Sequence, residues 1–320
     1  MIVTLTANPS LDRTVELPSP LKRGAVMRAE RTAQDSGGKG VNIARALKVS
    51  GFETVAVLPG DDEDPVLQGL RDEGVPFTNM PIGTSIRSNI TVVEPDGTTT
   101  KLNAPGEPLN GVAQQELTRL LIQETHDASW LVLAGSLPPG VQSDYYTVVG
   151  RALREALGEN APLIAVDTSG HALRDAVNGQ DGMPNLIKPN SEELAELVGR
   201  PDDWEELEGN IELTARTAQE LVSRGIDTVL ATLGGEGAVL VNKDGAWHAK
   251  HEPVHVRSTV GAGDCSLAGY LIAHEQGKTV EECLMQAVAH GSAAASLAGT
   301  QVPTLGQTAP EKVTVSPVIL

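Results

Sequence analysis

Ser258-Thr-Val-Gly-Ala-Gly-Asp-Cys-Ser-Leu-Ala268 is the stretch that decides how this chain is interpreted. A short apolar segment at 253–256 precedes it, and an apolar helical pattern follows Asp264. Glycines at a strand-to-helix junction leave backbone N–H groups free and let a ligand approach closely. Those groups suit an anion, and the neighbouring aspartate can take a proton from a hydroxyl. The stretch therefore predicts an anion hole beside a base, as phosphoryl transfer to an alcohol requires. A loop with a helix-capping aspartate is the alternative.

The composition bounds the class of protein and the class of partner. The chain has 320 residues, of which 40% are hydrophobic and only 2% aromatic, so its core must be aliphatic. The net charge of −18 argues against nucleic acid as a partner. No apolar run reaches the length of about 18 residues that a membrane span needs. Cys265 and Cys283 have neither a disulfide pattern nor a metal-ligand pattern, which fits a cytoplasmic protein.

Apolar β-rich runs alternate with longer helical patterns over most of the chain. This alternation predicts an α/β fold with a mostly parallel central sheet and helices on both faces, and ligands bind such sheets at the carboxyl ends of the strands. The tail after Gly306 has no periodicity and is expected to be loosely ordered. The predicted strands are Ile2–Thr6, Thr54–Leu58, Trp130–Leu133, Leu163–Val166, Asn185–Ile187 and Thr228–Ala231. The predicted helices are Gly40–Val49, Pro65–Glu73, Gly111–Glu124, Ser143–Leu157, Ser191–Val198, Ile211–Ser223, Ala262–Gln276 and Val280–Ala298.

Four further β-rich segments do not fit the parallel sheet. Arg13–Leu17 and Val26–Thr32 precede the first helix, and Ile86–Val93 and Thr98–Leu102 flank an Asp-Gly hairpin signal. We expect them to form a small β-sheet lid over the site, with an ordinary edge hairpin as the alternative. Because no linker or repeat is visible, the chain is predicted to be one domain, 1–320, with lid strands at about 13–32 and 86–103.

Gly37-Gly-Lys39-Gly-Val-Asn42 opens the first predicted helix. It lacks the glycine spacing and the Ser or Thr of a Walker A loop, and it is not a dinucleotide fingerprint. A loop that approaches a polar ligand closely, with one cation and one amide, is the remaining interpretation. Asp12, beyond the first strand, could accept hydrogen bonds from sugar hydroxyls; an Asx-turn is the alternative.

Two segments at strand ends are candidates for a nucleotide site. Asn190 and Glu193 share a helix face and could organise water around Mg²⁺, but they could equally form a capping box. The turn from Thr232 to Gly237 could follow a nucleotide, although a plain glycine-rich turn is the simpler interpretation. His290, on the last predicted helix, is expected to be structural rather than a nucleotide contact.

The motifs, in this order, resemble the ribokinase-like (PfkB) family of carbohydrate kinases over almost the whole chain. The two signatures are Gly37-Gly-Lys-Gly-Val-Asn-Ile-Ala44 and Thr259-Val-Gly-Ala-Gly-Asp264, and they lie at opposite ends of the chain. The resemblance implies a three-layer ribokinase-like sandwich with a lid. The segments that resemble the branch acting on sugar phosphates are Asn8-Pro9 with Asp12, Arg87-Ser-Asn89, Asn103-Ala-Pro-Gly106 and Gly135-Ser-Leu-Pro138.

The resemblance also implies roles for individual residues. Asp264 would be the general base, and the backbone of Gly261, Ala262 and Gly263 would hold the transferring phosphoryl group. The sugar hydroxyls would meet Asp12, Gly38 and Asn42, and the substrate phosphate would meet Lys39, Arg28 and Arg87 with Ser136 nearby. The ATP site would comprise Lys188, Asn190, Thr232, Gly234 and Gly237, with Mg²⁺ held through water by Asn190 and Glu193.

The activity implied is transfer of the γ-phosphoryl group of ATP to the C6 hydroxyl of fructose 1-phosphate, giving fructose 1,6-bisphosphate. A tagatose 6-phosphate kinase of the same fold is the alternative within the class, and a sugar-phosphate sensor without turnover is the alternative outside it. The resemblance further implies a homodimer that pairs through the lid strands.

Overall fold

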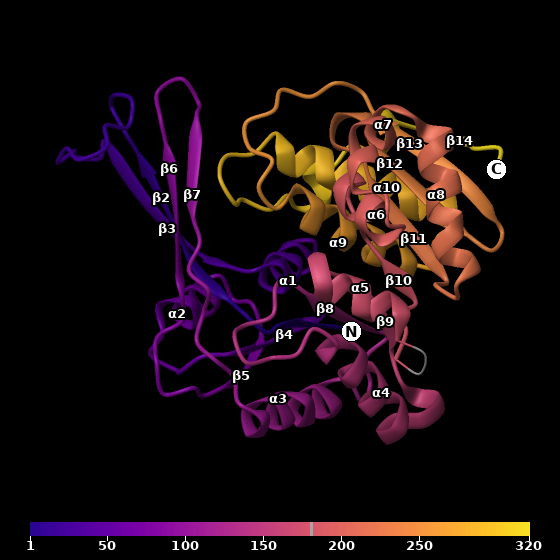
Figure 1. The fold of residues 1–320 in the computed structure, drawn as a ribbon, viewed down its shortest axis with the longest axis horizontal. Coiled ribbons are helices and arrows are strands. Elements are labelled where there is room, and N and C mark those ends of the chain that lie inside the picture. The colour runs from indigo at the N-terminus through magenta and orange to yellow at the C-terminus, as the bar shows by residue number, and fades with distance from the viewer. Residues whose placement is uncertain (180–181) are drawn as a thin grey trace.

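A computed structural model describes residues 1–179 and 182–320 and contains, within these ranges, one sheet of ten strands and one of four (Figure 1). In the large sheet, the neighbours from β11 to β5 are parallel, whereas β12, β13 and β14 are antiparallel. The prediction of a mostly parallel central sheet is confirmed. Its spatial order is β14 (Val313–Pro317), β13 (Gly245–His251), β12 (Ala238–Asn242), β11 (Thr228–Thr232), β10 (Leu186–Ile187), β9 (Leu163–Asp167), β8 (Trp130–Ala134), β1 (Ile2–Thr6), β4 (Thr54–Pro59) and β5 (Phe77–Met80).

Helices cover both faces of the large sheet because its central strands are apolar on both sides. Val3 and Leu5 of β1 pack in one hydrophobic cluster, and Ile2 packs in the other. The first cluster is covered by α3 (Gly111–Glu124), α4 (Tyr145–Leu157), α5 (Gly170–Asn178), α6 (Ser191–Leu197), α7 (Trp204–Gly209) and α8 (Ile211–Ser223). The second is covered by α1 (Lys39–Val49), α9 (Ala262–Glu275) and α10 (Val280–Ala295).

The helices α9 and α10 approach each other unusually closely. A Cβ at Gly269 would lie 2.5 Å from the carbonyl oxygen of Gln286 and 2.9 Å from the Cβ of His290, so only glycine fits. His290 is fully buried, as expected for a structural residue, and its Nδ1 lies within hydrogen-bond distance of Gln286, which is also on α10. This tight contact fixes α9, whose first turn carries Asp264.

The small sheet stands away from the large one at the indigo-to-magenta end of the chain (Figure 1). Its order is β3 (Arg31–Gly37), β2 (Ser10–Glu16), β6 (Ser88–Val93) and β7 (Thr99–Leu102), and we call it the lid. The prediction of a strand at Val26–Thr32 was wrong, because the strand begins at Arg31 and the residues before it form an exposed loop. Two prolines and a glycine in 18–24 favour a loop, whereas pairing with β2 makes a strand of the polar segment 31–37.

Two other expectations about the C-terminal part need correction. The segment 253–256 is not a strand, so a loop rather than a strand leads into α9. The tail after Gly306 is not loosely ordered, because β14 pairs with β13 and buries Val313. Alternation of apolar and polar residues over 313–317 is the signal for this edge strand.

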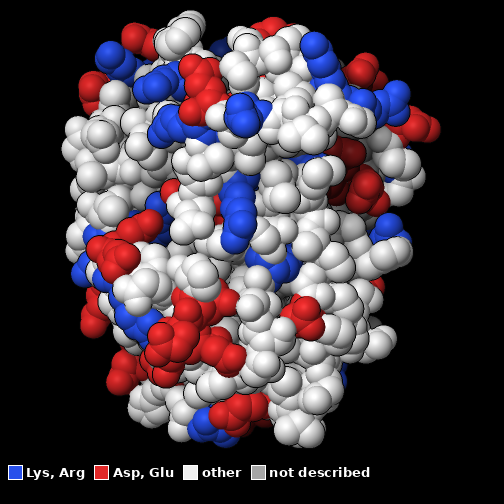
Figure 2. All heavy atoms as spheres, turned by 90° about the vertical axis from the view of Figure 1, so that its left-hand side faces the viewer, with Lys and Arg blue, Asp and Glu red and all other residues white. Residues whose placement is uncertain are grey.

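The surface is acidic overall but not uniformly so. On the face that carries the lid, basic and acidic side chains are interspersed (Figure 2). Over the described ranges, none of the helices is both long and apolar enough to cross a membrane.

Candidate active site

Asp264 lies in the first turn of α9, immediately after the glycine-rich loop. Gly261 is the N-cap, in the left-handed conformation with φ of 77°, which strongly favours glycine. Asp264 is only 6% exposed, and its Oδ2 accepts a hydrogen bond of 2.8 Å from Nδ2 of Asn42. Burial raises the pKa of Asp264, while the positive charge of Lys39 and the bond from Asn42 oppose this rise. A buried carboxylate with a raised pKa is suited to accept a proton from a hydroxyl.

The glycines at the start of α1 allow this helix to begin against β1. A Cβ at Gly38 would lie 2.5 Å from Cγ2 of Thr6, and the φ of 116° at Gly38 is itself unfavourable for other residues. A Cβ at Gly40 would lie 2.5 Å from Oγ1 of Thr6. This close approach explains why a sequence that is poor in helix propensity begins a helix here.

Asp12 on β2 faces the same loop. Its Oδ1 accepts hydrogen bonds from Oγ of Ser10 at 2.7 Å and from Nδ2 of Asn89 at 3.0 Å. A Cβ at Gly37 would overlap the Asp12 carboxylate, so glycine is required beside it. Asn89 was not predicted as a site residue, although it lies in a segment that carried the family resemblance.

Two amide oxygens of the site have no partner in the described part of the chain. They are Oδ1 of Asn42 and Oδ1 of Asn89, and both are buried. Buried acceptors are costly when unsatisfied, so each is a candidate to accept a hydrogen bond from a ligand hydroxyl.

Arg87 ties the lid to the loop that follows β1. Its guanidinium donates to the carbonyl oxygens of Asn8 at 3.0 Å, Pro9 at 3.3 Å and Ala104 at 2.8 Å. Three of its five N–H groups are thereby used, and two remain for a ligand. Ser136 lies close by, since its hydroxyl accepts from Nδ2 of Asn8 at 3.4 Å.

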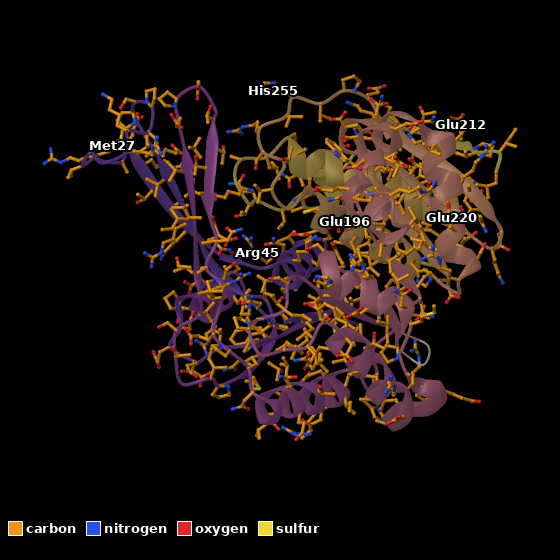
Figure 3. All side chains as sticks on the ribbon, viewed as in Figure 1. Met27, Arg45, Glu196, Glu212, Glu220 and His255 are labelled. Atoms are coloured by element: carbon orange, nitrogen blue, oxygen red, sulfur yellow. The ribbon has the colours of Figure 1, made fainter. Side chains whose placement is uncertain are left out.

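Arg28 is the predicted phosphate contact that the structure does not bring to the site. It is exposed in the loop between β2 and β3. Its neighbour Met27 lies at the outer end of the lid (Figure 3). Within one chain Arg28 therefore remains remote from Asp264.

Lys39 and Lys188 meet at a buried carboxylate that the sequence interpretation missed. Nζ of Lys39 lies 2.7 Å from Oδ1 of Asp167, and Nζ of Lys188 lies 3.2 Å from its Oδ2. Asp167 is completely buried at the end of β9. An acidic residue directly at the carboxyl end of an apolar strand is the signal that could have identified it.

Asn190 and Glu193 form the capping box that was one of their two interpretations. Oδ1 of Asn190 accepts from the backbone N–H of Glu193 at 2.8 Å, and Oε2 of Glu193 accepts from that of Asn190 at 2.9 Å. Burial raises the pKa of Glu193, against the opposing charges of Lys39 and Lys188. In the described ranges, no group of three or more His, Cys, Asp or Glu residues could hold a metal ion by itself.

The segment from Thr232 to Gly237 lies beside this capping box. The backbone of Thr232 donates to the carbonyl of Pro189 at 2.9 Å. Gly234 and Gly237 have φ of 51° and 87°, and a Cβ at Gly237 would overlap the carbonyl of Ala249. The glycines are therefore explained by the turn into β12, as the simpler interpretation had it.

The comparisons with known proteins agree with this geometry. The model of the pfkB family of carbohydrate kinases matches residues 6–305. The chain belongs to the PfkB family of carbohydrate kinases. The resemblance inferred from the two signatures is thereby confirmed, and so is the ribokinase-like fold.

Relatives of known name cover nearly the whole chain. A 1-phosphofructokinase of Haloferax volcanii is 33% identical over 307 residues, covering 95% of this chain and 94% of the relative. The ATP-dependent 6-phosphofructokinase isozyme 2 of Escherichia coli is 33% identical and covers 94% of each chain. The crystal structure of phosphofructokinase-2 from Escherichia coli in complex with potassium superposes with a TM-score of 0.84 at 30% identity, over 96% of each chain.

Proposed function

We propose that this PfkB-family protein is an ATP-dependent kinase that phosphorylates the C6 hydroxyl of fructose 1-phosphate, giving fructose 1,6-bisphosphate. The observation that carries the proposal is the position of Asp264, buried in the first turn of α9 and hydrogen-bonded by Asn42. A carboxylate beside the backbone N–H groups of a helix start can take the hydroxyl proton while those groups stabilise the charge on the transferred phosphoryl group. The names of the relatives support fructose phosphates as substrates.

On this proposal, Asp264 accepts the proton of the C6 hydroxyl as its oxygen attacks the γ-phosphorus of ATP. The backbone N–H groups of Gly261, Ala262 and Gly263 bind the equatorial oxygens of that group. Asp12, Gly38 and Asn42 would hold the sugar hydroxyls. Positioning and electrostatic stabilisation supply most of the acceleration in such transfers.

The phosphate that the sugar already carries would meet the two free N–H groups of Arg87, with Ser136 beside it. The ammonium group of Lys39 forms an ion pair with Asp167 and lies close to the charges of Asp264 and Glu193. Its role therefore differs from the predicted contact with the phosphate of the sugar. We therefore place Lys39 at the transferred phosphoryl group rather than at the phosphate of the sugar.

ATP would lie along Lys188, Asn190, Thr232, Gly234 and Gly237. A bound Mg²⁺ would supply positive charge that offsets the negative charge of the nucleotide phosphates. The side chains here fit a cation that is held through water. The capping box uses Oε2 of Glu193, so Oε1 of this half-buried carboxylate is available to bind the water. Asn190 and Glu193 would hold that water.

A homodimer through the lid completes the proposal. The lid exposes apolar side chains that a second lid could cover, Ile90 at 37% and Leu102 at 58%. Because Arg28 does not reach the site of its own chain, its proposed phosphate contact requires this dimer. Light scattering should give a dimer for the wild type and a monomer for Leu102→Glu.

One assay tests the proposed reaction. ATP consumption is measured with fructose 1-phosphate, fructose 6-phosphate, tagatose 6-phosphate, fructose and ribose. We expect the highest kcat/KM with fructose 1-phosphate. A higher value with fructose 6-phosphate would move the assignment to the activity named for the 33% identical isozyme 2. Binding without turnover of any sugar would indicate a sensor.

A further inference from the structure

Asp167 is a buried carboxylate that the proposed reaction does not use directly. It is completely buried, and its two oxygens face two different lysines, Lys39 at 2.7 Å and Lys188 at 3.2 Å. Neither lysine has another ion pair in the described ranges. Burial by itself raises the pKa of Asp167, but Lys188 and Lys39 outweigh it and lower the pKa, so the group is an anion at neutral pH.

The three residues come from two strand ends and one helix start. Asp167 ends β9, Lys188 follows β10, and Lys39 is the first residue of α1. Asp167 also accepts a hydrogen bond from the N–H of Gly135, but with its backbone carbonyl, at 2.9 Å. The backbone role of Asp167 is therefore separate from that of its side chain, whose ion pairs within the described ranges are with the two lysines.

The two ammonium groups lie where the phosphoryl group would be transferred. A Cβ at Gly263, in the anion hole, would lie 3.2 Å from Nζ of Lys188. Lys39 lies close enough to Asp264 and Glu193 for both charges to act on it. The lysine pair therefore lies near both the proposed base, Asp264, and Glu193, which is proposed to hold magnesium-bound water.

Two lysines at one small site need a counter-charge. Lysine side chains have many rotamers, and two ammonium groups repel each other, so without a partner they would point apart. One carboxylate between them relieves the repulsion and leaves a net charge of +1 on the trio.

We propose that Asp167 is a positioning residue that holds the ammonium groups of Lys39 and Lys188 against the phosphoryl group in transfer. This inference rests on the proposed kinase function. Electrostatic groups accelerate such a step only when they are oriented before it begins, so the gain belongs to kcat rather than to binding of the sugar phosphate.

The test compares wild type, Asp167→Asn, Lys39→Met and the double variant in steady-state kinetics with fructose 1-phosphate. Asp167→Asn keeps the shape and removes the charge. We expect it to lower kcat by about 100-fold and to change KM for the sugar phosphate by less than about threefold. In the Lys39→Met background, the same substitution should lower kcat by no more than about tenfold, since one of the two groups it orients is gone.

A matched control is Asp64→Asn. Asp64 is also a buried aspartate, but it caps α2 (Pro65–Asp72) and accepts from the N–H groups of Val66 at 2.9 Å and Ile86 at 2.8 Å. Asp64→Asn should lower the melting temperature, because it weakens the cap of α2. It should leave kcat within about twofold of wild type. A general effect of losing a buried charge would lower kcat in both variants and overturn the proposal.

The remaining outcomes are also decisive. Asp167→Asn with a kcat within about threefold of wild type overturns the assignment of Asp167 alone, because the active wild type upholds the kinase function. If the wild type transfers no phosphate to any sugar, both the proposed kinase function and the proposed role of Asp167 are refuted. If Asp167→Asn does not fold, Lys39→Arg takes its place: it keeps the charge but displaces it, so kcat should fall by at least about tenfold. Wild-type kcat in Lys39→Arg overturns the proposal.

Discussion

Nδ2 of Asn42 donates a hydrogen bond of 2.8 Å to Oδ2 of Asp264, joining residues that are 222 positions apart in the chain. Asn42 lies on α1 and Asp264 on α9, and these two helices pack on the same face of the sheet. The bond fixes one oxygen of the carboxylate and leaves the other for a substrate. It also connects the two family signatures, so each supplies one partner of a single site.

The first prediction concerns the base. Asp264→Asn keeps the shape of the side chain but removes its ability to accept a proton, so kcat should fall by about three orders of magnitude or more. Sugar-phosphate affinity, measured by calorimetry, should change by less than about threefold, since the carboxylate is not needed for binding. Asp244→Asn, on the exposed turn between β12 and β13, is the control. Turnover close to wild type in Asp264→Asn would end the assignment.

The second prediction concerns Arg87. Arg87→Ala should raise KM for the sugar phosphate by about tenfold or more and leave KM for ATP within about twofold, because the guanidinium lies at the sugar end. It should also lower the melting temperature, since three bonds to backbone carbonyls are lost. Arg119→Ala, which loses only a surface ion pair on α3, should change neither KM. Equal increases in both KM values would show that Arg87 does not contact the sugar phosphate.

The sequence was sufficient to predict the layers of the fold and the members of the site that stand in signatures. Short, continuous runs of apolar residues in the sequence identify the central strands, because a strand buried on both faces must be apolar throughout. The helices Gly111–Glu124 and Ile211–Ser223 have the predicted bounds. By contrast, β3 was misplaced because its segment 31–37 is polar and becomes a strand only through pairing with β2.

Ion pairs between distant segments could not be predicted in the same way. Asp167 and Lys188 are brought together by the pairing of β9 with β10, and Lys39 by the packing of α1 against β1, neither of which the sequence states. The assignment of Lys39 to the sugar phosphate followed from its signature alone, without knowledge of this partner. A local motif reports which residues are at a site, but the tertiary arrangement decides which charge each one meets.

The third prediction concerns the close approach of α1 to β1. Gly40→Ala would place a methyl group 2.5 Å from Oγ1 of Thr6 and 2.6 Å from the carbonyl of Leu5, so the helix must shift. We expect a loss of about 1–3 kcal/mol in the free energy of unfolding. Gly111→Ala, at the start of α3 with open space around it, is the matched control and should be neutral or slightly stabilising. Chemical denaturation of both variants measures the difference, and equal values would refute the steric argument.

The last prediction concerns the pH dependence of stability. Burial lowers the pKa of His290 to about 4, so the ring is neutral in the folded protein, whereas the unfolded chain takes up a proton near 6.5. Protons therefore favour the unfolded state, and stability present above pH 6.5 is lost as the pH falls from 6.5 toward 4. The free energy of unfolding should fall by about 3 kcal/mol because of His290 alone.

His290→Gln should flatten the dependence of the free energy of unfolding on pH, measured by denaturation experiments between pH 4 and 7. His255→Gln, in the exposed loop labelled in Figure 3, should leave the curve unchanged. A wild-type slope in His290→Gln would show that other groups cause the acid sensitivity.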